Sequence, residues 1–259
     1  MLVFLCEDDF ETILCGIYDA WCENNHSGVR LEIKSFSQRE LFSEYREVQL
    51  EEEKAEKVIR SVKRKLSGEF FEHLYQIFLS SDGEKADIMY RFLIKGFAHG
   101  KQAFYMLQDE DMMRAFALTR YVRRESHSII EFLRFEKMWN EIYVAKINPK
   151  NHVLPMIADH FSQRLNPENF LIYDENRNVA VVHPAGKPWF FIKLQAEEWK
   201  GIFQNMDGEK TYLVRDKEDY GKLWKVFVDT IAVEGRINPK LQRQMLPYRY
   251  RGHMTEFEQ

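Results

Sequence analysis

Basic side chains and a histidine recur along one predicted helix with a spacing that suits the binding of an anion. Arg120, Arg123, Arg124 and His127 follow at intervals of three and four, so they can project from one side of that helix. Cations near a helix C-terminus also suit the helix dipole, so the same row can serve stability alone. Arg134, on the segment that follows, is harder to explain by capping and favours an anion-binding surface.

A second pair of candidate residues lies on the predicted helix from Val153 to Leu165. His160 and Arg164 are four residues apart and therefore share a helix face. An imidazole with a pKa of about 6.5 can exchange a proton near neutral pH, and a guanidinium can hold a phosphate through two parallel hydrogen bonds. His127 and His160 are thus the candidate acid–base residues. The alternative is a polar outer face of the helix.

The segment from Arg236 to Arg251 has the most uneven charge, with five basic residues and no Asp or Glu. Tyr248 and Tyr250 alternate in it with arginines. Aromatic rings can stack on bases while arginines pair with phosphates, as in many single-strand nucleic-acid surfaces. The alternative is that this basic segment packs against acidic parts of the chain.

The elements that must position these residues are typical of an α+β protein with a mainly helical N-terminal half. Apolar periodicity predicts a strand, a helix and a strand at the start, followed by helices in the ranges 51–66, 67–79, 88–97 and 112–122. The 51–66 helix has its acids first and its bases last, which fits a solvated face or a phosphate-facing edge.

Short aromatic and β-branched segments then predict a small antiparallel sheet flanked by helices. The expected strands are 132–135, 142–147, 170–173, 179–182 and 189–192, and the expected helices are 153–165, 196–204 and 217–233. Small polar residues at 80–83 predict a boundary between two regions, 1–80 and 81–259.

Composition excludes several classes of protein. The 259 residues are 45% hydrophobic with only 12 Gly and 7 Pro, which indicates a globular chain. A net charge of -4 means that any anion site must be local. Cys6, Cys15 and Cys22 match no metal or redox motif, and no cofactor is expected. No secretory or membrane-spanning segment is visible, so we expect a cytoplasmic protein without a membrane partner.

Several segments resemble a bacterial family of unknown function whose members are described as DNA repair or DNA metabolism proteins. The resemblance rests on Arg124–His127, Phe132–Phe135, Tyr143–Pro149 and Val153–Arg164, and on a closing pattern from Leu223 to Phe257. It extends over nearly the whole chain, including Phe10–Leu14 and Lys54–Val58 near the start.

The resemblance implies a radical-SAM DNA repair protein as a partner, and relatives fused to uracil-DNA-glycosylase-like domains. The CxxxCxxC spacing of a radical-SAM cluster is absent, so any radical step would take place on that partner. With the signature positions added, the candidate nucleic-acid-binding residues are Arg120, Arg123, Arg124, Arg134, Arg164, Arg236, Asn238, Gln242, Arg249, Tyr250 and Arg251.

Three functions remain open at this point. The first is an accessory protein of DNA repair that binds DNA and works with the radical-SAM partner. The second is a DNA-processing enzyme, a lyase, nuclease or base-processing activity, that uses His127 and His160. The third is a protein–protein adaptor that docks the partner without touching DNA.

Overall fold

The chain forms two compact units in a computed structural model. The first unit comprises Met1–Arg124 and the second Glu125–Gln259, so the division falls within a helix. The structure describes residues 1–23, 25–137 and 141–193, together with 195, 197, 240, 242, 243, 246–251 and 254. The helices expected at 196–204 and 217–233 therefore lie outside the described residues, apart from position 197.

The first unit contains a parallel sheet of three strands, in the order β2-β1-β3. The central strand β1 (Leu2–Cys6) is an almost continuous buried segment, as expected for a strand with neighbours on both sides. Strand β2 (Val29–Ile33) alternates buried and half-buried residues, and β3 (Glu44–Glu47) forms the other edge. Sequence periodicity predicted the first two strands but missed β3, whose four residues are mostly exposed and polar.

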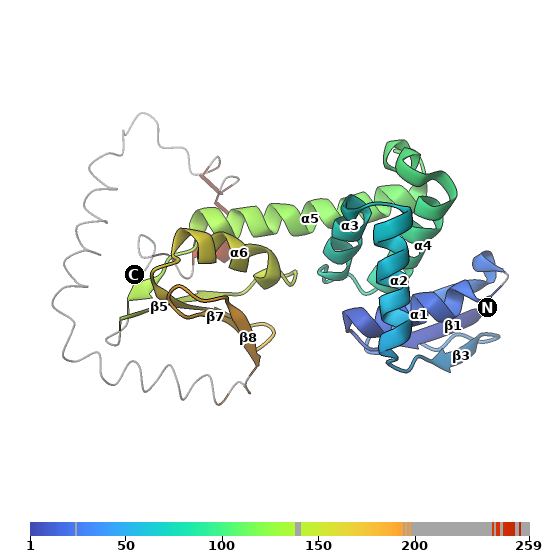
Figure 1. Ribbon diagram of the computed structural model, residues 1–259, viewed down its shortest axis with the longest axis horizontal. Helices are drawn as coiled ribbons and strands as arrows, with labels where there is room; N and C mark the ends of the chain where they lie inside the picture. Colours follow the sequence, from blue (N-terminus) through green and yellow to red (C-terminus); the bar gives the residue numbers. More distant parts are fainter. Residues whose placement is uncertain are drawn as a thin grey trace. The chain divides into compact units, whose positions relative to one another are not determined.

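Helices make up the rest of this unit (Figure 1). They are α1 (Phe10–Trp21), α2 (Glu52–Lys65), α3 (Gly68–Phe78), α4 (Lys85–His99) and the part of α5 (Glu110–Phe132) up to Arg124, with short 3-10 turns at His26–Gly28 and Gly100–Tyr105. Two helix starts have local causes: the side chains of Asp9 and Ser67 accept hydrogen bonds from the backbone N–H groups of Thr12 and Phe70.

The core of the first unit lies between the sheet and these helices. The core includes the buried side chains of Ile13, Leu14 and Ile17 from α1 and that of Phe70 from α3. Gly16 permits α1 to approach the sheet closely, because a Cβ there would lie 2.6 Å from the Sγ atom of Cys6.

The second unit contains a sheet of five strands, in the order β4-β5-β6-β7-β8. The strands are β4 (Glu136–Lys137), β5 (Ile142–Ile147), β6 (Asn169–Asp174), β7 (Val179–His183) and β8 (Phe190–Lys193). The sheet is mixed rather than antiparallel, because β5 and β6 run parallel while the other pairs are antiparallel. Helix α6 (Leu154–Arg164) forms the crossover that parallel neighbours require.

The prediction of a strand at 132–135 is wrong. Phe132 ends α5, and the N–H of Leu133 still donates to the carbonyl oxygen of Ile129 at 2.8 Å. Phe135 instead packs edge-on against Phe161 of α6 and Phe170 of β6, with ring centroids 5.2 and 5.8 Å apart. A short apolar segment cannot by its periodicity distinguish the last turn of a helix from a strand.

None of the helices within the described residues is both long and apolar enough to cross a membrane. The α+β class and the helical N-terminal half are confirmed. The domain boundary predicted after residue 80 stays a prediction.

Candidate functional site

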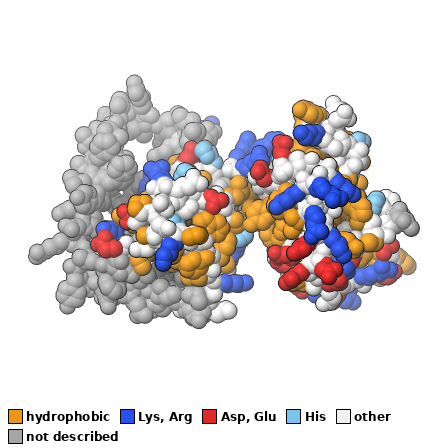
Figure 2. Space-filling model, in the orientation of Figure 1, with side chains coloured by type: hydrophobic (Ala, Val, Ile, Leu, Met, Phe, Trp, Pro, Cys, Tyr) orange, Lys and Arg blue, Asp and Glu red, His pale blue; other side chains and the backbone are white. Residues whose placement is uncertain are grey.

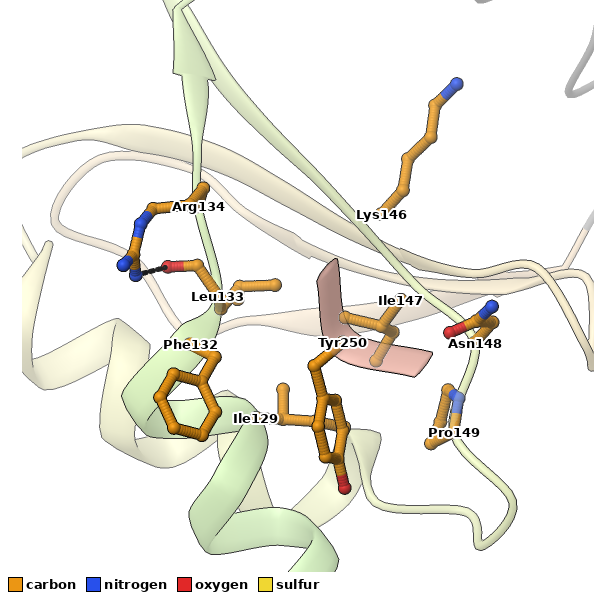
Figure 3. A pocket seen from close by; sticks show the side chains of 9 residues that line it. All are labelled: Ile129, Phe132, Leu133, Arg134, Lys146, Ile147, Asn148, Pro149 and Tyr250. Atoms are coloured by element: carbon orange, nitrogen blue, oxygen red, sulfur yellow. Dashed lines mark hydrogen bonds between the residues drawn. The ribbon is translucent and has the colours of Figure 1, made fainter. Parts of the chain in front are cut away.

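A small hollow in the second unit brings together two residues that the sequence proposed for nucleic-acid binding, Arg134 and Tyr250. It lies where the end of α5, the end of β5 and the short helix α10 (Tyr248–Arg251) meet (Figure 3). Its volume is about 30 Å³, far below the roughly 300–1,000 Å³ of typical small-molecule sites. The hollow therefore has no room for a base or a sugar, and any larger ligand must bind on the surface around it.

The two tyrosines of α10 have different surroundings. Tyr250 lines the hollow together with Ile129 and Pro149, and its ring centroid lies 6.1 Å from that of Phe132 (Figure 3). Tyr248 is 65% exposed. Tyr250 thus attaches α10 to the second unit, whereas Tyr248 offers its ring to solvent.

Arg251 stands beside the exposed tyrosine. Its guanidinium carbon lies 4.6 Å from the centroid of the Tyr248 ring, a cation–π arrangement. Its Nε and Nη2 atoms donate to the carbonyl oxygen of Leu246 at 3.2 and 3.1 Å. The alternating Tyr and Arg residues of the sequence are therefore partly ordered as a stacked pair at the surface.

Two cationic side chains border the hollow away from the Tyr250 ring. Arg134 precedes β4 and Lys146 belongs to β5, and Figure 3 shows both charged ends extending away from that ring. Arg134 also stabilises the end of α5, since its Nη1 atom donates to the carbonyl oxygens of Glu131 and Leu133, each at 3.4 Å. Arg134 was expected to be harder to explain by capping than the other cations, but the helix continues to Phe132 and these contacts give Arg134 a capping role.

A buried carboxylate fixes the loop beside the hollow. Glu125, only 3% exposed, accepts hydrogen bonds from the backbone N–H groups of Lys150 and Asn151 at 3.1 and 2.8 Å. The Asn151 side-chain amide donates to the same carboxylate at 2.7 Å. Burying a carboxylate is costly unless it is hydrogen-bonded, and here two backbone groups and one side chain solvate it.

The other side of this loop is held by Asp174, Asn176 and Arg177. Asn176 Nδ2 and Arg177 Nη1 donate to the Pro149 carbonyl oxygen at 2.8 and 3.2 Å, and Arg177 also donates to the Lys150 carbonyl oxygen. Arg177 is oriented by an ion pair with Asp174 at 3.0 Å. Burial raises the pKa of the Asp174 carboxyl, although Arg177 opposes that rise. Together with Glu125, this network fixes the loop wall of the hollow.

The two candidate acid–base histidines do not meet. His127 is 74% exposed, and its Nε2 lies 3.1 Å from a carboxylate oxygen of Glu131 on the same helix. His160 is half-buried on α6, where its ring meets Phe161 edge-on. Within the described residues no polar contact connects them, so the geometry provides no paired acid and base.

The remaining candidates are distributed over several elements. Arg120, Arg123 and Arg124 are exposed on the part of α5 that belongs to the first unit, and Arg123 Nε donates to the Gln76 side chain at 2.8 Å. Arg164 is exposed in the last turn of α6.

Near the end of the chain, Gln242 is exposed and its carbonyl oxygen accepts from the N–H of Leu246. Arg249 belongs to α10 by its backbone. Arg236 and Asn238 lie outside the described residues. These positions stay predictions.

Sequence reasoning missed Lys146, Glu125 and Arg177. Lys146 carried a signal, since it is the one charged residue in an otherwise apolar or aromatic β5 segment. No feature of the sequence distinguished Glu125 and Arg177 from charged residues on the surface. Among the described residues, no three His, Cys, Asp or Glu side chains form a group that could hold a metal ion.

The fold and the sequence together place the chain in a class and a family. Its two units contain both helices and sheets, which makes it an α+β protein. Residues 83–256 match the family described as a domain of unknown function, DUF4130. The chain belongs to this DUF4130 family. A comparison with curated proteins gave no match.

Proposed function

We propose that this protein binds single-stranded or locally opened DNA through the second unit. The observation that carries the proposal is the exposed ring of Tyr248 with the half-buried Arg251 beside it, on a helix that Tyr250 attaches to the unit. An exposed ring offers a face on which a base of any sequence can stack. A guanidinium held beside that ring can pair with the phosphate of the same nucleotide.

The charges around the small hollow support the same function. Arg134 and Lys146 border it, and the network around Glu125 and Arg177 keeps its loop wall in place. Cations on an ordered surface can contact successive phosphates of a strand, which gives affinity without sequence preference. The small volume of the hollow favours a nucleic-acid strand lying on this surface over a small molecule enclosed within the hollow.

The proposal also includes a cellular role. The family resemblance supports an accessory role in DNA repair or DNA metabolism beside a radical-SAM partner. In this role the chain would hold the DNA while the partner performs the chemistry. Co-expression with that partner followed by affinity purification, repeated after nuclease treatment, tests the role. Co-purification that survives nuclease supports a direct contact, and failure to co-purify contradicts it.

Fluorescence anisotropy with a labelled single strand of about 20 nucleotides tests the binding itself. With about three phosphate contacts, raising the salt from about 50 to about 200 mM should weaken binding about 20-fold. A duplex of the same sequence should bind more weakly, because its bases cannot stack on Tyr248.

Variants assign the binding to the proposed surface. Tyr248→Ala and Arg251→Gln should each weaken binding about tenfold, since stacking on one base contributes roughly 1–3 kcal/mol. Lys187→Gln, in an exposed turn of the same unit, is the matched control and should bind as the wild type does. Salt-insensitive binding, or equal losses in the control, would contradict the proposal.

A further inference from the structure

A much larger hollow lies in the first unit, between α1, α2 and α4. Its volume is about 390 Å³, within the range of roughly 300–1,000 Å³ that is typical of small-molecule sites. Aromatic and aliphatic side chains form most of its lining, and polar groups come from α2. A site of this composition can enclose an apolar ligand body and orient it through a few polar contacts.

The aromatic residues that line this hollow are held in place by contacts with neighbouring rings. Trp21, which is 38% exposed, meets Phe97 edge-on, with ring centroids 5.2 Å apart. Trp21 also packs against His26 and Tyr90, with ring centroids 5.2 and 6.2 Å apart. The Tyr90 hydroxyl lies 2.7 Å from Nδ1 of His26 and donates to the Ala20 carbonyl oxygen at 3.1 Å. The Trp21 ring is therefore ordered before any ligand arrives.

Positive charge lies along one edge of the same hollow. Lys57, Ser61 and Lys65 line it from α2 and are spaced four residues apart, so they share one face of that helix. Lys57 lies 5.8 Å from the Tyr18 ring centroid and 3.6 Å from Glu53, which is 88% exposed. Lys65 is exposed and makes no ion pair among the described residues.

The position of these lysines follows from the charge order of α2. All of its exposed acids, which end at Glu56, precede its exposed bases, which begin at Lys57, and Figure 2 shows Lys and Arg above Asp and Glu on this face of the first unit. An exposed pair such as Lys57 and Glu53 contributes little, so an anionic ligand can displace the glutamate.

We propose that this hollow binds a small planar aromatic anion. The ring of the ligand would lie against Trp21 and Phe97, and its anionic group would receive hydrogen bonds from Ser61, Lys57 and Lys65. Flat aromatic walls favour a flat ligand, because stacked and edge-on ring pairs contribute beyond their buried area. This inference is independent of DNA binding by the second unit.

Two kinds of ligand share this chemistry, a nucleoside monophosphate and an aromatic carboxylate. Isothermal titration calorimetry on the full chain can use a matched set of probes for both. The anions are 2-naphthoate and deoxyadenosine monophosphate, and the neutral analogues are 2-naphthamide and deoxyadenosine. Octanoate carries the charge without a ring.

We expect at least one aromatic anion to bind about tenfold more tightly than its neutral analogue and than octanoate, because two lysines contribute about 1.4 kcal/mol or more to that difference. Preference for the nucleotide or for naphthoate identifies the ligand class, and either supports the site. Equal affinity for an anion and its neutral analogue, equal affinity for octanoate, or no binding of either anion overturns the proposal.

Variants and a chemical probe locate the binding. A double variant with Lys57→Gln and Lys65→Gln should lose the preference for the anion, while Lys63→Gln, on the same helix but outside the lining, should keep it. Cys22 also lines the hollow and is exposed, whereas Cys6 and Cys15 are buried. The bound anion should slow alkylation of Cys22, as read by mass spectrometry. Unchanged alkylation at saturating anion would place the ligand elsewhere and overturn the assignment.

Discussion

Both units place cations beside aromatic rings, but the hollows that these residues border differ greatly in size. The first unit leaves about 390 Å³ among three helices, and the second leaves about 30 Å³ where α10 docks. Trp21 and Phe97 line the hollow in the first unit, whereas the ring of Tyr250 lines the hollow in the second and lies near that of Phe132. Similar residue types therefore favour a small ligand held in a hollow of the first unit and a DNA strand lying on the surface of the second.

The largest expected effect concerns the buried carboxylate that fixes the loop in the second unit. Glu125→Ala would leave the N–H groups of Lys150 and Asn151 without their acceptor, and should lower the free energy of unfolding by about 3 kcal/mol. Urea denaturation measures this change, and hydrogen exchange should place it in peptides that contain residues 148–151.

Glu131→Ala is the matched control on the same helix. Glu131 forms an exposed pair with His127, and such pairs contribute at most about 1 kcal/mol. Equal losses of unfolding free energy in the two variants would show that the hydrogen bonds of Glu125 contribute no more to stability than an exposed ion pair does.

The next effect concerns close packing in the first unit. Gly16→Ala would place a Cβ atom 2.6 Å from Cys6 Sγ and 3.3 Å from a methyl group of Val48. Overpacking of this kind costs about 2 kcal/mol and should displace α1, which carries Trp21. Thermal unfolding and the affinity for 2-naphthoate should both fall.

Gly68→Ala is the control for Gly16, since nothing lies within 4 Å of its added Cβ. It should retain wild-type stability or gain slightly, because alanine is the better helix former. A Gly16 variant that is as stable as the Gly68 variant would contradict the tight contact of α1 with the sheet.

Acid should weaken the first unit through His73. Burial lowers the pKa of this imidazole, and the charge of Arg123 lowers it further. The unfolded chain therefore binds more protons below about pH 6.5, so stability falls as the pH drops from there through the lowered folded pKa, by at most about 1.4 kcal/mol per pH unit.

The variant His73→Phe tests this dependence, because its ring can stay among Phe92, Phe104 and Phe116 without titrating. Urea denaturation at about pH 7 and about pH 5 should show a smaller loss than in the wild type. His127→Gln, on an exposed position, should keep the wild-type loss. Identical losses in wild type and His73→Phe would exclude His73 as the cause.

The smallest effect separates the two tyrosines of α10. Tyr250→Ala should lower the stability of the second unit by about 1 kcal/mol, since it removes the ring contact with Phe132. Tyr248→Ala, at an exposed position, should change stability by at most about 0.5 kcal/mol. Thermal unfolding measures both, and a reversed order would contradict the assignment of Tyr250 as the anchor and Tyr248 as the binding ring.

Local patterns predicted much of the secondary structure. Asp9 and Ser67 begin helices because a capping side chain needs only neighbours three residues away. The pairing of β5 with β6 was not predictable in the same way, since its direction depends on where α6 returns the chain. The candidate site was predicted in part: Arg134 and Tyr250 were proposed, but Lys146 was not.

The amino-acid sequence by itself determined the α+β class, the charge order along α2 and the concentration of tyrosine and arginine between residues 236 and 251. These features depend on residue type and on spacing of a few positions. Only the tertiary structure decided that Lys57 and Lys65 face a ligand-sized hollow and that Tyr250 turns inward while Tyr248 turns outward. These side-chain orientations depend on the space left between elements that are far apart in the chain, and local periodicity does not predict that space.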